Sequence, residues 1–120
     1  MAPSAGEDAP RRDLTALLAR VTALTSGRVV LMGMPPVRAF PRVPRPAAVV
    51  LGRHADRMDR VGVDVARRHD VRHLPLPARL LEVEDAFAAD GFHPSAQSHD
   101  LLAGMVADLL DADGRRTTSA

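Results

Sequence analysis

The 120-residue chain contains no cysteine, tryptophan, tyrosine, lysine or asparagine, and it has only three phenylalanines. Without cysteine it cannot form disulfides, thiolate metal sites or a thiol nucleophile. The shortage of aromatic rings predicts a core of Leu, Val, Ala and Met side chains. No apolar run approaches the length of a membrane span, and residues 1–10 lack the apolar stretch of a signal peptide, so we expect a cytoplasmic chain.

Positive and negative charges nearly cancel, because 16 arginines face 15 acidic residues. Nucleic-acid binding requires basic residues gathered on one surface, whereas acidic residues are interspersed with the arginines here. We therefore expect no nucleic-acid partner. The length allows one small domain.

The hydrophobic pattern alternates between long helices and short strands. Apolar residues spaced by three and four predict helices over residues 10–25, 47–69 and 96–111. In the second of these helices the inward-facing apolar stripe is Ala48, Leu51, Ala55, Met58, Gly62 and Val65. Two short apolar runs, residues 28–34 and 71–76, predict strands. The order helix, strand, helix, strand, helix is typical of an α/β fold with a parallel sheet between helices.

Residues 10–112 are expected to form one unit, between a disordered leader (residues 1–9) and a disordered tail (residues 113–120). The first strand is apolar on both faces, which is typical of a central strand with a neighbour on each side. The chain offers only one other strand. We therefore expect part of the sheet to be missing, with self-association through the open sheet edge as one consequence.

A carboxylate and an imidazole stand three residues apart in the turn Asp90-Gly91-Phe92-His93-Pro94-Ser95. Many hydrolases hold a general base by placing a carboxylate beside a histidine. The turn follows the last predicted strand and precedes the last predicted helix, where α/β sheets carry functional residues. Asp90 and His93 are therefore the candidate catalytic residues, while Ser95 is a typical helix N-cap.

This turn resembles the final conserved block of the SGNH hydrolases, also called GDSL esterases and lipases. The similarity extends over about residues 13–110 and includes the run Gly-Arg-Val-Val-Leu-Met-Gly-Met-Pro-Pro, the Phe-Pro loop and Leu-Gly-Arg at residues 51–53. It implies a three-layer α/β/α, flavodoxin-like fold that hydrolyses a small-molecule or lipid ester without cofactor or metal. By the same resemblance, His93 is the general base and Asp90 orients it.

Three features of that family have no counterpart in the sequence. There is no Gly-Asp-Ser for the nucleophile, no oxyanion-hole glycine, and no Gly-x-Asn-Asp block. The resemblance therefore implies the C-terminal half of such a domain, from a truncated gene or a mis-assigned start, and an ester hydrolase fragment that is inactive alone. The alternative is a non-catalytic remnant or an interaction module that uses the exposed sheet edge.

The remaining serines and histidines fit structural roles better than catalytic ones. Among the serines, Ser4 and Ser119 fall in the predicted tails, Ser26 ends a helix, and Ser98 lies in the first turn of another. The histidines lack partners at the spacing of metal ligands, so we expect no metal site at His54, His69-Asp70, His73 or His99-Asp100.

Overall fold

The computed structural model describes residues 5–76 and 78–118, and over these ranges it confirms the predicted alternation of helices and strands. The main elements are α1 (Asp8–Leu24), β1 (Val30–Met32), α2 (Arg45–Arg68), β2 (Arg72–Leu74) and α3 (Ala96–Thr118). Three 3-10 turns accompany them, η1 (Ala5–Glu7), η2 (Val37–Ala39) and η3 (Ala78–Leu81).

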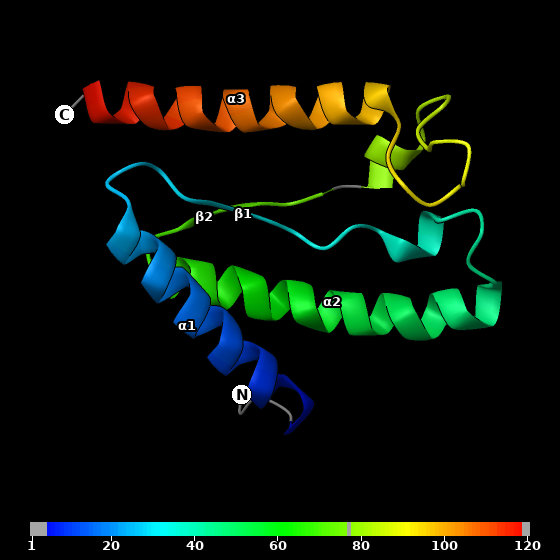
Figure 1. Cartoon of the computed structure of the whole chain (residues 1–120), viewed down its shortest axis with the longest axis horizontal. Helices are drawn as coiled ribbons and strands as arrows, with labels where there is room; N and C mark the ends of the chain where they lie inside the picture. The colour runs from blue at the N-terminus through cyan, green and yellow to red at the C-terminus, as the bar shows by residue number, and fades with distance from the viewer. Residues whose placement is uncertain (1–4, 77, 119–120) are drawn as a thin grey trace.

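The two strands form a small parallel sheet, as the sequence predicted. Val30 pairs with Arg72 and Met32 with Leu74, and the Gly33 amide extends the ladder with a 2.7 Å hydrogen bond to the Leu74 carbonyl. Helix α3 lies on one side of the strands, and α1 and α2 lie on the other side (Figure 1). The chain is thus an α/β protein in which helix predominates.

The core is aliphatic, in agreement with the composition. Its buried side chains come from α1, α2 and the residue before β2, where apolar positions of neighbouring helical turns face each other. Burial of each leucine or valine side chain in this core contributes on the order of 2 kcal/mol. The fully buried set is Leu18, Val61, Val65, Ala66 and Val71, with Leu14, Val29, Leu31 and Met58 packed around it.

Helix α3 is held to the rest of the chain mainly at its two ends. Near its C-terminus, Arg28 donates to the Leu110 carbonyl, and Arg72 Nε lies 3.1 Å from Asp113 Oδ2. The apolar side chains of its middle turns are only half-buried. The helix continues to Thr118, past its predicted end, since these arginine contacts support its last turns.

Other helix limits also differ from the prediction. Residues 5–7 form η1 and α1 begins at Asp8, so residues 5–9 are not the disordered segment that the sequence suggested. On α2 the expected buried stripe included Leu51, which is 48 % exposed, while Gly52 is buried beneath the Arg38 side chain. None of the described helices is long and apolar enough to cross a membrane.

Candidate functional site

The turn that carries Asp90 and His93 is a short hairpin built on the start of α3. The Ser95 amide donates to the Ala86 carbonyl (3.0 Å), and the Ala88 amide donates to the His93 carbonyl (2.8 Å). Gly91 closes the turn with a φ of 68°, a left-handed conformation that glycine adopts without steric cost. The hairpin lies beyond the carboxyl ends of β1 and β2 (Figure 1), the end of the sheet that the sequence predicted for the site.

The Asp90 carboxylate makes three local hydrogen bonds. Oδ1 accepts from the amides of Phe92 (2.9 Å) and His93 (3.0 Å), a side-chain arrangement by which aspartate commonly shapes turns. Oδ2 contacts Nδ1 of the His93 ring. The carboxylate therefore holds both the backbone of the turn and the imidazole.

These contacts lower the pKa of the Asp90 carboxyl well below its ordinary range. The hydrogen bond with the His93 side chain contributes most, and the amides of Phe92 and His93 add to it, because all three donors favour the charged form. Asp90 is therefore a carboxylate at neutral pH and accepts the proton of His93 Nδ1. This fixes the tautomer in which Nε2 of His93 carries the free lone pair.

All three phenylalanines of the chain pack together beside the imidazole. Phe40, which follows η2, meets Phe87 and Phe92 edge-on with ring centroids 5.3 and 5.4 Å apart. Phe92 in turn meets the His93 ring at 5.5 Å. This cluster, which local sequence patterns do not reveal, joins the connection between β1 and α2 to the hairpin.

The Asp90–His93 pair faces outward and is not enclosed. The His93 side chain is 72 % exposed and that of Asp90 is 48 % exposed. Within the described part of the chain, Nε2 of His93 has no hydrogen-bond partner. The lone pair that would take a proton is thus open to a group arriving from outside.

The serines near the pair serve the backbone. Ser95 caps α3, as predicted, by accepting a 3.2 Å hydrogen bond from the Ser98 amide. Ser98 is buried and donates to the Ala86 carbonyl (2.6 Å). Ser26 lies between α1 and β1, at the amino end of the sheet, whereas Ser4 and Ser119 lie outside the described residues.

A second histidine–aspartate pair, which the sequence analysis missed, joins β2 to α2. Nε2 of His73 lies 3.3 Å from Oδ1 of Asp59, and the same oxygen accepts a 3.0 Å hydrogen bond from the Met34 amide. The side chains of His73 and Asp59 both lie close to Gly33, and a Cβ added there would lie 2.9 Å from Asp59 Oδ1. Asp59 therefore holds the end of β1 to α2 through the Met34 amide, whereas Nε2 of His73 lies buried beside it without a hydrogen bond in the described residues.

Among the described residues, no cluster of three or more His, Asp or Glu side chains could hold a metal ion. His73 faces Asp59 instead of combining with His69 and Asp70.

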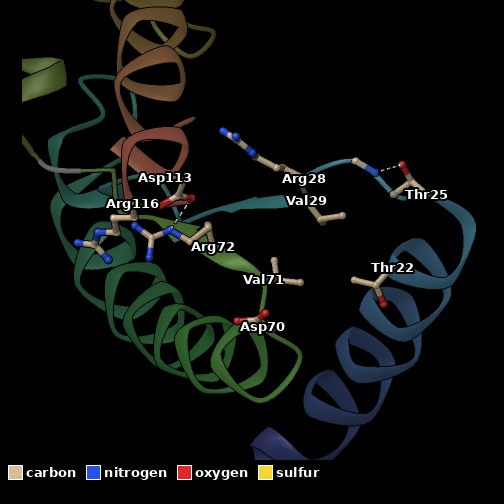
Figure 2. Close-up of a pocket in the computed structure, with 10 residues that line it drawn as sticks. Thr22, Thr25, Arg28, Val29, Asp70, Val71, Arg72, Asp113 and Arg116 are labelled. Atoms are coloured by element: carbon tan, nitrogen blue, oxygen red, sulfur yellow. Dashed lines mark hydrogen bonds and ion pairs between the residues drawn. The ribbon is translucent and has the colours of Figure 1, made fainter. Parts of the chain in front are cut away.

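A cavity of about 370 Å³ (Figure 2) lies at the amino ends of β1 and β2, where Val29, Val71 and Arg72 contribute to its lining. Helices α1 and α3 contribute their C-terminal residues to it, including Thr22, Thr25 and Arg116. Helix C-termini carry partial negative charge, and the arginines here offset it. Little positive potential is therefore left to attract an anion. Arg72, which also lines the cavity, is already paired with Asp113.

Comparison of the chain with protein-family models, with curated proteins and with solved structures finds no match. The candidate site is therefore defined by its own geometry, a carboxylate that holds an exposed imidazole by Nδ1.

Proposed function

We propose that this chain supplies the base and its orienting carboxylate to an ester hydrolase of the SGNH type, with a partial flavodoxin-like three-layer fold. The observation that carries the proposal is the contact between Asp90 Oδ2 and His93 Nδ1, which leaves Nε2 unoccupied. The resemblance of residues 90–95 to the last block of that family supports the same assignment. The substrate would be a small-molecule or lipid ester.

In this mechanism a serine hydroxyl gives its proton to Nε2 of His93 as its oxygen attacks the ester carbonyl. Asp90 stabilises the imidazolium, which then protonates the leaving alcohol and leaves an acyl-serine. His93 next takes a proton from water, whose oxygen attacks the acyl group. It then gives that proton to the serine oxygen as the acyl–oxygen bond breaks, which releases the carboxylic acid and restores the serine hydroxyl. His93 and Asp90 return to their starting states.

The serine and the oxyanion donors must come from outside the described residues. Ser95 and Ser98 are engaged in the cap of α3, and Ser26 lies at the other end of the sheet. A base without a nucleophile and oxyanion donors provides little rate enhancement. We therefore expect the purified chain alone to show no burst of p-nitrophenol from p-nitrophenyl acetate.

The test has two arms that use the same ester. The first arm assays the chain alone. The second arm assays the longer polypeptide that is translated when the DNA upstream of the Met1 codon is included. The proposal predicts hydrolysis only in the second arm, with loss of at least about a hundredfold in rate in His93→Ala. If the longer protein hydrolyses the ester equally well after His93→Ala, the role of His93 as general base is refuted. If the chain alone gives a burst that depends on His93, the need for a serine from outside the described residues is refuted.

A further inference from the structure

Strand β1 has one hydrogen-bonded edge and one open edge. The Gly33 amide and the Val29 carbonyl bond to β2. Because successive residues of a strand turn their backbone groups to opposite sides, the amides and carbonyls of Val30 and Met32 point to the open edge. In the described residues the sheet contains β1 and β2 only, so these groups have no strand partner.

The residues of this open edge are apolar and carry no protective charge. The strand reads Val-Leu-Met, and Met32 is 47 % exposed. The free edge of the sheet on the other side belongs to β2. This strand begins with the charged Arg72 and is followed by Pro75, two features that discourage further pairing. An incoming strand would therefore join β1 and not β2.

A cavity of about 280 Å³ lies between α1, α2 and β1. A cavity of roughly 150 Å³ can hold a benzene ring, so this one has room for a large aliphatic side chain. Thioethers contribute much of its wall, and such side chains adapt to different partners. Its lining includes Leu14, Leu31, Met32, Met34, Met58 and His73.

The chain also exposes more surface than a compact protein of its mass. Its accessible surface is 8365 Å², whereas a folded monomer of 12.9 kDa is expected to expose about 6,300 Å². Its radius of gyration is 16.2 Å, against an expected value of about 13.6 Å. The surplus of about 2,000 Å² indicates that this chain leaves exposed a surface that a compact protein of its mass would bury, and an added strand can cover part of it.

We propose that the open edge of β1 and the cavity beside it form a binding site for an extended apolar polypeptide segment from outside the described residues. The segment adds to the sheet as a strand, bonds to the backbone of Val30 and Met32, and places one large aliphatic side chain in the cavity. This inference does not depend on the chemistry of Asp90 and His93.

A single extended segment fits this site better than a second copy of the chain. Helix α1 borders the cavity through Pro10 and Leu14. A two-fold dimer through β1 would bring the two α1 helices together in the same space. A lone segment avoids that crowding and still satisfies the open strand edge.

The test titrates the purified chain into a fluorescein-labelled synthetic peptide, Lys-Thr-Val-Leu-Val-Thr-Lys, and follows fluorescence anisotropy. We expect saturable binding that weakens about tenfold or more when the central leucine becomes alanine, and likewise in the Met32→Lys variant. The matched control is Leu101→Lys, which makes the same kind of change at an exposed residue of α3 and should bind normally. Absence of binding at millimolar chain, or equal binding by Met32→Lys, would overturn the proposal.

Amide exchange of the unmodified chain gives a readout that does not rely on a variant. Peptide should slow exchange at Val30 and Met32, while Gly33 is already bonded to Leu74 and should change little. Unchanged exchange at Val30 and Met32 contradicts the proposal. Light scattering measures whether the chain is a monomer or a dimer. A dimer that dissociates in the Met32→Lys variant would assign the surface to a second copy of the chain instead.

Discussion

The ring of Phe40 meets the ring of Phe92 edge-on, with centroids 5.4 Å apart. Phe40 follows η2 in the connection between β1 and α2, whereas Phe92 lies between Asp90 and His93 in the hairpin. The contact therefore joins two connections that leave the same end of the sheet. Helix α3 fixes the other side of the hairpin through Ser98 and the Ala86 carbonyl. The two contacts together hold an otherwise exposed turn.

The left-handed residue of the hairpin should not tolerate a side chain. Gly91 has a φ of 68°, and an added Cβ would lie 2.7 Å from Cγ of Arg42. Since the left-handed conformation costs about 1–2 kcal/mol for other residues, Gly91→Ala should lower the free energy of unfolding by that amount in urea titrations. Gly104→Ala is the matched control, because α3 has open space there and alanine favours helix by about 1 kcal/mol. Equal effects of the two substitutions would show that the hairpin does not have this backbone conformation.

The buried hydroxyl of Ser98 should contribute measurably to stability. It is buried and donates to the Ala86 carbonyl over 2.6 Å, and a hydrogen bond of this kind contributes about 1 kcal/mol. Chemical denaturation should show a loss of that size in Ser98→Ala. Ser26→Ala, at an exposed serine, should change stability by less than about 0.5 kcal/mol. A neutral Ser98→Ala would contradict the hydrogen bond between the Ser98 hydroxyl and the Ala86 carbonyl.

The charge on Asp90 should persist into strongly acidic solution. Its hydrogen bonds favour the carboxylate, so they lower its pKa, and their contribution to the turn is complete above the ordinary aspartate value of about 4. It is lost only as the pH falls through the lower pKa of the folded chain. Carboxyl ¹³C NMR should give a midpoint well below 4, which His93→Ala raises toward the ordinary value because it removes the main donor. The same midpoint in both proteins would argue against the contact with the imidazole.

Sequence reasoning succeeded where the determining interactions are local. The alternation of helices and strands follows from hydrophobic periodicity, and the cap at Ser95 follows from its place before an apolar stripe. Asp90 and His93 meet because they stand three positions apart in one turn. The α/β fold class with a parallel sheet was predicted from the same alternation of helices and strands.

Pairs that form only through tertiary packing could not be predicted. Asp59 and His73 come from different elements, and no spacing rule connects them. Phe40 is also far along the chain from Phe87 and Phe92, yet its ring contacts both of theirs. On α2 the periodic pattern pointed to Leu51 as buried, but Arg38 covers the adjacent Gly52 instead. Periodicity identifies the face of a helix, and the neighbouring elements decide which part of it is covered.

The most direct test of the central claim, that Asp90 holds His93 as a base, is the imidazole tautomer of His93. Nitrogen-15 NMR of the neutral ring reports which nitrogen carries the proton, and it needs neither nucleophile nor substrate. We expect the proton on Nδ1 in the unmodified chain, and loss of this preference in Asp90→Ala. His54, which has no carboxylate contact in the described residues, serves as the internal control. A proton on Nε2 of His93, unaffected by Asp90→Ala, would contradict the account.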